Sequence, residues 1–390
     1  MTPEEEAIRK AFPSLDQKQV FFDNAGGSQV LGTVTASIRS YFEQHNVQLD
    51  ASYSLSRAAT TMFDDAHAVC ARYLNAEADE IVLGASTTQL LRNLSTALKL
   101  TAGDEIIVSA IDHEANIAPW VDLAEQRGLV LRWWRPDHTT NPKLTASDLH
   151  SLLSPNTKLV TCTHASNILG TINDVKSIAR MAHSVGALVC VDGVGYAAHR
   201  PIDVKELGVD FYCLSWYKVY GPHISMLYAR QSAQHRVRSL GHYFNSPVGI
   251  TGKIGLAGAS YELVQSLPHV VEYLGKYDSP KWQAAIAQEE HLQGILLAYL
   301  CSRPDVTIYG ERKSDAALRV STVSFTVKGW NCNELAQAVE RQSNYAVRAG
   351  HNYAERLVRD LLGRGQDGVL RVSILHYNTG KTYSFHCSYN

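Results

Sequence analysis

The sequence predicts an α/β protein, with a large domain built on a mostly parallel sheet between helices and a smaller C-terminal α/β domain. The length of 390 residues allows about two domains, since one domain takes roughly 100–200 residues. Between residues 80 and 230, short β-rich runs alternate with helical patterns, which is typical of parallel strands joined by helices. A long helical segment at 279–301 then precedes a second, shorter group of strands.

The large sheet is expected to hold seven strands. Each is a β-rich run, and the helical periods between them are long enough for parallel crossovers. The predicted strands are 80–85, 105–110, 129–134, 158–164, 187–192, 211–215 and 225–230, and the predicted helices are 88–100, 116–127, 175–185 and 204–207.

The C-terminal region predicts a smaller domain. Residues 279–301 begin with a Ser-Pro pair and keep the helical period for about six turns. The strands expected beyond them are 306–310, 319–327, 345–350 and 370–378, with one helix at 333–343 and a polar, aromatic tail that has no helical period. We therefore assign residues 18–279 to the large domain, and residues 1–17 and 280–390 to the small domain.

The composition excludes several classes of partner. The 36 basic and 38 acidic side chains give a net charge of −2, and 45% of residues are hydrophobic against 19% charged. Neither disorder nor binding to nucleic acid is therefore expected. No run of about 18 apolar residues is present, so no membrane association is expected. The first residues are acidic where a signal peptide would be basic and then apolar, so we expect a cytoplasmic protein.

The seven cysteines are scattered along the chain, with no C-x-x-C pair and no histidines at zinc spacing. We expect them to be reduced thiols. No metal site is expected.

One motif matches the pattern of a dinucleotide-binding enzyme. Residues 193–198, GVGYAA, follow a predicted strand and match the G-x-G-x-x-A pattern of dinucleotide-binding proteins. That pattern needs a full helix after the glycines, so that the helix N-terminus faces a pyrophosphate. His199, Arg200 and Pro201 would end such a helix within a turn, which makes a dinucleotide site a weak alternative.

Polar side chains follow the predicted strands, at the edge where open α/β sheets place their ligands. Ser86, Thr87 and Thr88 begin a helix directly after the strand at 80–85. Their hydroxyls and the free N–H groups of a helix N-terminus would suit a phosphate. An ordinary helix cap explains these residues equally well.

Four more residues extend this series. His113 and Asn167 each follow a predicted strand. Asp192 ends an apolar run, where an ionised carboxylate is costly unless it meets a cation. Lys218 lies between aromatic residues before a Gly-Pro turn, where burial would disfavour the ammonium form, as a Schiff-base lysine requires. Each residue alone is more commonly structural, but in this order they indicate one cofactor site.

In this order the motifs resemble those of fold-type I pyridoxal-phosphate enzymes of the class-V aminotransferase and cysteine desulfurase family. The resemblance covers nearly the whole chain, from FFDNAGGSQ at 21–29 to RVSILHYNT at 371–379. Its most specific segments are DHEANIAPW at 112–120, THASNILGT at 163–171, SWYKVYGP at 215–222 and RAGH at 348–351. The resemblance implies that the large domain binds pyridoxal 5'-phosphate.

The resemblance also implies a role for each candidate residue. Lys218 would form the Schiff base with the cofactor and shuttle protons, Asp192 would pair with the pyridinium nitrogen, and His113 would stack on the ring. The other implied cofactor contacts are Ser86, Thr87, Thr88, Asn167, Ser215, Tyr217 and Ser260. The implied substrate contacts are Arg371, which would bind an amino-acid α-carboxylate in bidentate fashion, Asn24 and Tyr353.

Family members are homodimers whose sites are completed across the subunit interface. Residues 253–262, KIGLAGASYE, resemble the segment that reaches the neighbour's phosphate. The usual threonine is Ala259 here, which leaves Ser260 or backbone N–H groups for that contact. Gly195 is a second departure, because desulfurases place a glutamine there.

A third departure bears on the reaction. A cysteine desulfurase carries a nucleophilic thiolate after its R-x-G-H segment, and the residue at that place is Tyr353. Persulfide chemistry is therefore disfavoured. Within the family the chain is similar to the pyridoxal-phosphate enzyme of fungal loline-alkaloid clusters, which implies a Cα carbanion (quinonoid) and carbon–carbon bond formation by an intramolecular Mannich closure.

A group of aromatic residues could shelter the cationic iminium of such a closure by cation–π attraction, although a place in the core explains them at least as well. They are Trp216, Tyr217, Tyr220, Tyr243 and Tyr353.

Other functions stay open. A pyridoxal-phosphate C–S lyase needs the same carbanion and only a leaving group for β- or γ-elimination. A transaminase is less favoured because it needs a second keto acid. A scaffold that only binds is less favoured because Lys218 and Asp192 are both retained.

Overall fold

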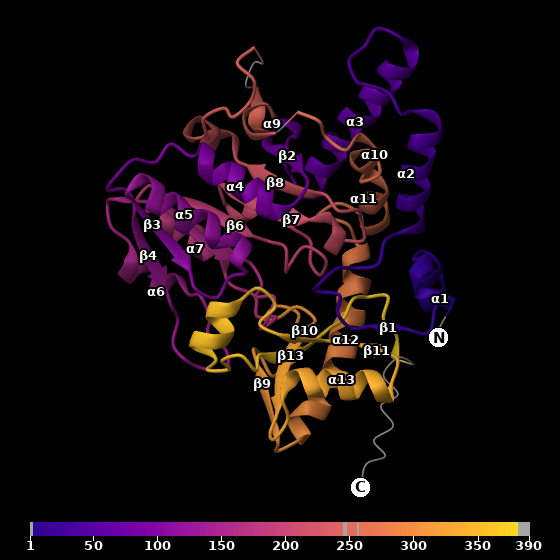
Figure 1. Ribbon diagram of the computed structural model, residues 1–390, viewed down its shortest axis with the longest axis vertical. Coiled ribbons are helices and arrows are strands. Elements are labelled where there is room, and N and C mark those ends of the chain that lie inside the picture. Colours follow the sequence, from indigo (N-terminus) through magenta and orange to yellow (C-terminus); the bar gives the residue numbers. More distant parts are fainter. Residues whose placement is uncertain (1–2, 245–247, 256, 381–390) are drawn as a thin grey trace.

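The computed structural model describes residues 3–244, 248–255 and 257–380 (Figure 1). Its larger sheet has seven strands in the order β2-β8-β7-β6-β5-β3-β4. The strands are β2 (Ile81–Gly84), β3 (Glu105–Ser109), β4 (Val130–Trp134), β5 (Thr157–Thr163), β6 (Leu188–Asp192), β7 (Phe211–Ser215) and β8 (Ser225–Ala229). All seven strands predicted for this sheet are present.

The sheet is mostly parallel, as predicted. β7, β6, β5, β3 and β4 run parallel, whereas β8 runs antiparallel to both β2 and β7. The connection from β7 to β8 spans only residues 216–224, too short for the crossover that a parallel pair needs. Because β2 and β7 are both antiparallel to β8, the carboxyl ends of β2, β3, β5, β6 and β7 meet at one edge.

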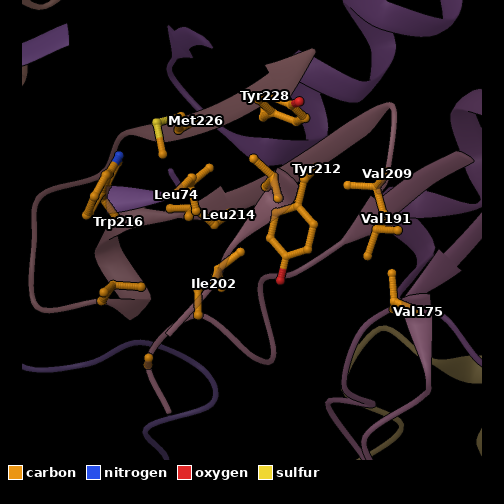
Figure 2. Close-up of a cluster of buried hydrophobic side chains, with 14 of the residues drawn as sticks. Leu74, Val175, Val191, Ile202, Val209, Tyr212, Leu214, Trp216, Met226 and Tyr228 are labelled. Carbon is orange, nitrogen blue, oxygen red and sulfur yellow. The ribbon is translucent and has the colours of Figure 1, made fainter. Parts of the chain in front are cut away.

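Helices cover both faces of this sheet, because alternate residues of each strand point to opposite sides. Ile106 of β3 belongs to the core that includes Trp120 of α5, whereas the adjacent Ile107 belongs to the core that includes Ile178 of α7. Figure 2 shows part of the second core, in which Val191 and Val209 lie beside the Tyr212 ring. The helices are α1 (Pro3–Lys10), α2 (Gly32–Gln44), α3 (Ser54–Tyr73), α4 (Thr87–Ala97), α5 (Ala118–Arg127), α6 (Ala146–Leu152), α7 (Val175–His183), α8 (Val204–Leu207), α9 (Gly249–Ile254), α10 (Tyr261–Val264) and α11 (Pro268–Leu274).

The C-terminal part forms a second, antiparallel sheet in the order β12-β13-β10-β9. Helix α12 (Lys281–Ser302) begins two residues after the predicted start at 279 and buries Leu292, Leu296 and Leu300 in a third core with this sheet. In Figure 1, α12 extends from the layer of the large sheet into the C-terminal part. The remaining elements here are β9 (Val306–Tyr309), β10 (Thr322–Val327), α13 (Cys332–Gln342), β12 (Arg348–Gly350), the π-helix Arg356–Leu361 and β13 (Val369–Ser373).

Three strand predictions were wrong in detail: the strand predicted at 319–327 begins only at Thr322, the one predicted at 370–378 ends at Ser373, and the one predicted at 345–350 is divided. Residues 345–350 form two short strands, because the chain changes partners after Ala346. β11 (Tyr345–Ala346) pairs with β1 (Val20–Phe21), whereas β12 pairs with β13. This exchange brings the N-terminal segment beside the small sheet. The domain boundaries at 17/18 and 279/280 stay predictions, and the tail at 381–390 lies outside the described residues.

Within the described part of the chain, no helix has the length and apolar character needed to cross a lipid bilayer.

Candidate active site

The polar residues predicted at the strand ends meet at the carboxyl edge of the large sheet. They line two adjoining chambers that share His113, Asn167, Tyr217 and Lys218. The inner chamber is also lined by Ser86, Thr87, Thr88, Thr163, Asp192, Gly195 and Ser215. The outer chamber, of about 500 Å³, reaches Arg348, His351, Asn352, Tyr353 and Arg371. Residues from both sheets therefore form one site.

Hydroxyl groups gather at one end of the inner chamber, where α4 begins. Ser86 caps the helix and accepts a hydrogen bond from the N–H of Gln89 at 3.1 Å. Thr87 Oγ1 lies 2.7 Å from Ser215 Oγ and 3.2 Å from Ser225 Oγ. Hydroxyls and free N–H groups at a positive helix end can hold a phosphate. Ser225, which the sequence analysis did not single out, completes this cluster.

Lys218 lies in a 3₁₀ turn directly after β7, with its side chain in the wall shared by both chambers. Burial and the nearby Arg371 guanidinium lower the pKa of the Lys218 amine to about 8, although Asp192 and Asp23 oppose this. A larger share of the amine is therefore neutral near pH 7 than for an ordinary lysine. A neutral amine can add to a carbonyl group or accept a proton.

Asp192 ends β6 and is buried. Its Oδ1 accepts a hydrogen bond from the N–H of Val194 at 2.9 Å. Burial raises the pKa of this carboxyl, because an unsolvated carboxylate lacks the stabilisation of water. A cationic group in the inner chamber would therefore be bound favourably beside it.

His113 and Asn167 lie in the wall shared by the two chambers. Burial lowers the pKa of His113 to about 4, so its ring is neutral at physiological pH. Its Nδ1 accepts a hydrogen bond from the N–H of Ala115, and its ring stacks on Tyr353 with centroids 5.2 Å apart. Asn167 Nδ2 donates to the Asn352 carbonyl at 2.8 Å, which uses one of its two N–H groups. A flat neutral ring and a free amide hydrogen suit an aromatic ligand that carries an oxygen.

Arg371, on β13, lines the outer chamber together with Lys218. Its Nη2 donates to Asp23 Oδ1 at 2.9 Å and its Nη1 to the Asn167 carbonyl at 3.2 Å. Arg348 and Asp23, to which the sequence analysis gave no role, lie beside it. The RAGH segment contained Arg348, but only the pairing of β12 with β13 places it next to Arg371.

The structure does not bring Asn24, an expected substrate contact, to either chamber. Its side chain is buried. Its amide donates to the carbonyls of Phe21 and Ser373, and its oxygen accepts from the Tyr377 hydroxyl at 2.5 Å. These bonds use the polar groups of Asn24 to join the N-terminal segment to β13.

The structure does not bring Ser260 to the chambers. With Ala259 it lines a separate cavity near His223 and α9. A contact from Ser260 to the phosphate site would have to be made in another subunit, and it stays a prediction.

The predicted group of aromatic residues is not one pocket. Trp216 and Tyr220 are fully buried in the core, and Tyr243 is fully exposed. Tyr217 and Tyr353 do line the outer chamber. The core interpretation therefore holds for two of the five residues.

The structure does not support the alternative of a dinucleotide site, because no helix follows the glycines at 193 and 195. Residues 194–199 form turns, so no helix N-terminus faces the inner chamber here. The two glycines allow close packing: a Cβ on Gly193 would lie 2.1 Å from the Tyr212 ring, and one on Gly195 would lie 2.5 Å from the Ala165 carbonyl. A glutamine at position 195 would require this backbone to move.

Comparison with known proteins agrees with this site. The family model of class-V aminotransferases matches residues 20–382. The aminotransferase-like protein FGM3 of Gibberella zeae is 52% identical over 96% of this chain and 94% of its own length. The cysteine desulfurase-like protein ustD of Aspergillus flavus is 39% identical over 98% and 89%. The cysteine desulfurase CsdA of Escherichia coli superposes with a TM-score of 0.83 at 26% identity, over 97% of this chain and 95% of that one.

The chain belongs to the class-V aminotransferase family and has the fold of the cysteine desulfurases, which is fold type I of the pyridoxal-phosphate enzymes. It is a pyridoxal-phosphate-dependent enzyme. The described residues fit this cofactor: a buried carboxyl that favours a cation, a lysine with a lowered pKa, and hydroxyls at a helix N-terminus lie around one chamber.

Proposed function

We propose that this enzyme acts on an L-amino acid through a carbanion at Cα and joins that carbon to an electrophilic carbon. The observation that carries the proposal is that Lys218 and Arg371 line the same chamber, so that a substrate carboxylate held by the guanidinium brings Cα near the amine. Bound pyridoxal phosphate supplies an electron sink for the carbanion.

The inner chamber would hold the cofactor in one orientation. Ser86, Thr87, Thr88 and Ser215 would bind its phosphate together with the first turn of α4, with Tyr217 beside them. Asp192 would pair with its ring nitrogen. His113, which is neutral, would stack on the ring, and the free N–H of Asn167 would donate to the ring oxygen. All of these residues line the inner chamber.

The outer chamber would bind the substrate. Arg371 would hold the α-carboxylate through charge-assisted hydrogen bonds, and Tyr353 would lie beside the substrate side chain. The Lys218 amine would accept the Cα proton and, as an ammonium group, return a proton later. Its lowered pKa supports this exchange near neutral pH.

Carbon–carbon bond formation is favoured over sulfur transfer because no thiol of the described part of the chain lies in the chambers. Tyr353 occupies the place of the desulfurase thiolate, and its ring, with Tyr217, could stabilise a cationic iminium. An intramolecular Mannich closure in fungal alkaloid metabolism is the specific form that we propose, and the fungal sources of FGM3 and ustD support specialised metabolism.

A C–S lyase is the alternative, because elimination needs the same carbanion. The two reactions differ in their products. A keto acid with a released thiol would identify the lyase, whereas a product that keeps the amino-acid nitrogen and gains a carbon–carbon bond would identify the proposed enzyme.

Absorption spectra and product analysis test the proposal together. We expect the purified protein to show the visible absorption band of the bound cofactor, and we expect Lys218→Ala to lack the wild-type band. We also expect one amino acid, from a panel that includes γ-substituted homoserines, to change the wild-type band and to be consumed. Mass spectrometry of the product then separates bond formation from elimination. A wild-type protein without cofactor, or one whose band no amino acid perturbs, would contradict the proposal.

We further propose a homodimer in which residues 253–262 of one subunit complete the phosphate site of the other. Tyr243, Phe244 and Val248, near this segment in sequence, are exposed, which supports an interface here. A cytoplasmic location also stays a prediction.

A further inference from the structure

Two arginines stand directly opposite each other in the wall of the outer chamber. Arg348 of β12 and Arg371 of β13 are paired in register, and both line the chamber. Like charges at directly opposed positions of a sheet repel each other and destabilise the pair. The structure must therefore compensate at least one of these charges.

Asp23 provides that compensation with both of its oxygens. Its Oδ2 accepts from Arg348 Nε at 2.7 Å and lies 2.6 Å from Arg348 Nη2. Its Oδ1 accepts from Arg371 Nη2 at 2.9 Å. One carboxylate therefore fixes the positions of two guanidinium groups that lie on neighbouring strands.

The position of Asp23 is itself fixed by the backbone around it. Asp23 forms a β-bridge with Ser373, whose Oγ accepts from the N–H of Ala25 at 2.8 Å. The turn that follows encloses the carboxylate, since a Cβ on Gly26 would lie 3.1 Å from each of its oxygens. Asp23 is thus held beside Arg371 by the N-terminal segment and does not depend on a ligand for its place.

The charges around the outer chamber leave one positive charge in excess. None of the described residues that line it is acidic, and Asp23 offsets one of the two arginines. His113 is neutral, and under the proposed function the Lys218 amine would be taken up by the cofactor. The buried Nε of Arg371 has no hydrogen-bond partner.

We propose that Asp23 sets the charge of the substrate site: by holding Arg348 and Arg371 together it leaves one uncompensated positive charge, so that the site accepts an amino acid with one carboxylate and disfavours one with two. Asp23 acts through the arginines and is a positioning residue. This inference rests on the proposed function, because Arg371 is taken to bind the substrate carboxylate.

The test compares propionate with succinate, which carry one and two carboxylates and need no reaction to be measured. Binding of each to the cofactor-loaded protein is followed by calorimetry. We expect the wild type to prefer propionate, and Asp23→Asn to shift the ratio of the two dissociation constants toward succinate by about tenfold or more, the effect of about 1.4 kcal/mol. Asp23→Glu, which keeps the charge, should restore the preference of the wild type.

Glu105→Gln is the matched control. Glu105 also binds an arginine through two hydrogen bonds, but it lies at the amino end of β3, away from the chambers. Its replacement should leave the ratio unchanged. If Asp23→Asn leaves the ratio as in the wild type, or Asp23→Glu shifts it equally, the inference is wrong. A wild type without the cofactor band would overturn the proposed function instead, and the two failures are therefore distinguishable.

Discussion

At the scale of single residues, burial shifts two groups of the site in opposite directions. It raises the pKa of the Asp192 carboxyl and lowers that of the Lys218 amine, because in each case burial disfavours the charged form. Pairs of groups whose environments separate their pKa values in this way are typical of acid–base sites. Lys218 is thereby prepared to react as a free amine, and Asp192 to receive a cation.

The pH dependence of cofactor capture should report the Lys218 pKa. Only the free amine attacks the cofactor aldehyde, and this form increases as pH rises through the pKa. The capture rate of cofactor-free protein should therefore rise with pH and level off above about 8 rather than near 10.5, the ordinary lysine value. Stopped-flow absorption measures this rate, with Lys218→Ala as the control that captures none. A rate still rising steeply toward pH 10.5 would contradict the lowered pKa.

Replacement of Arg371 should affect the substrate more than the cofactor. Arg371→Ala removes charge-assisted hydrogen bonds to the α-carboxylate, which are worth about 1.5–3 kcal/mol each. We expect KM for the amino acid to rise by about tenfold to a hundredfold, with the cofactor band retained. Steady-state kinetics and absorption spectra measure the two effects. Loss of the band would show that Arg371 supports the cofactor.

At the scale of elements, the site depends on close packing just beyond β6. Gly193 follows Asp192 directly, and the Tyr212 ring of β7 occupies the space where a side chain would lie. The Tyr212 hydroxyl is also within 2.9 Å of His164 Nδ1, so the ring has little room to move. Packing between two strands therefore fixes the carboxyl that would meet the cofactor.

Gly193→Ala should disturb this packing. A Cβ only 2.1 Å from the ring must displace Tyr212 or the end of β6, at a cost of about 1–3 kcal/mol in unfolding free energy. Cofactor affinity should also fall because Asp192 moves. Gly186→Ala is the control: it has a φ of +76° and open space around an added Cβ, so it should lower stability alone. Equal cofactor affinity in the two variants would contradict this account.

At the amino end of the strands, Glu105 of β3 links its strand to β4 and to the segment before β5. Its carboxylate accepts from Arg132 of β4 at 2.8 and 2.9 Å and from Ser154 before β5 at 2.7 Å. These hydrogen bonds lower its pKa to about 2. A lowered pKa in the folded state stabilises the protein above the unfolded value, and this stabilisation disappears as pH falls through the folded value.

Glu105→Gln should therefore destabilise the protein by about 1–3 kcal/mol at pH 7. The difference from the wild type should narrow as pH falls from 4.5 toward about 2. Urea unfolding at several pH values measures it. Glu43→Gln, which removes an exposed ion pair with Arg39, should cost less than about 1 kcal/mol. If the difference in unfolding free energy between the wild type and Glu105→Gln did not change with pH, the ionised carboxylate of Glu105 would not be the source of the stabilisation.

At the scale of the whole molecule, the site lies where the two sheets approach each other. Lys218 and Asp192 come from the large sheet, and Arg348 and Arg371 from the small one. The loop that contains Tyr353 also contacts the 3₁₀ turn that follows β3, because the Tyr353 carbonyl accepts a hydrogen bond from the N–H of Glu114 at 2.7 Å. A change in the relative position of the two sheets would therefore alter the outer chamber more than the inner chamber, because only the outer chamber is lined by residues of both sheets.

Light scattering should give twice the chain mass of 43.0 kDa, as expected for the proposed dimer. Replacing Tyr243 and Phe244 by serine together should weaken the dimer and the retention of cofactor, because both side chains are exposed apolar surface. Trp330→Ser, which changes an exposed aromatic residue of the C-terminal part, is the control. A monomeric wild type that retains the cofactor would exclude a site completed by a partner.

The sequence alone predicted all seven strands of the large sheet, the long helix α12 and the ordered series from Ser86 to Lys218. Each of these depends on local information: hydrophobic periodicity, helix caps, and polar residues at strand ends. The parallel order of the strands then brings these residues to one edge of the sheet. The sequence therefore determined which of these residues line the inner chamber, apart from Ser260.

Arg371 and Tyr353 of the outer chamber were expected from the resemblance, but only the tertiary structure decided the charge balance around them. Asp23, Arg348 and Arg371 are far apart in the chain, and their contacts depend on the pairing of β12 with β13 and on the β-bridge between Asp23 and Ser373. In the same region the side chain of Asn24 makes hydrogen bonds to Ser373 and Tyr377, whereas the family resemblance had implied a substrate contact for it. Long-range strand pairing and side-chain direction leave no local periodicity, and for this reason the charge balance of the site could be found only in the folded molecule.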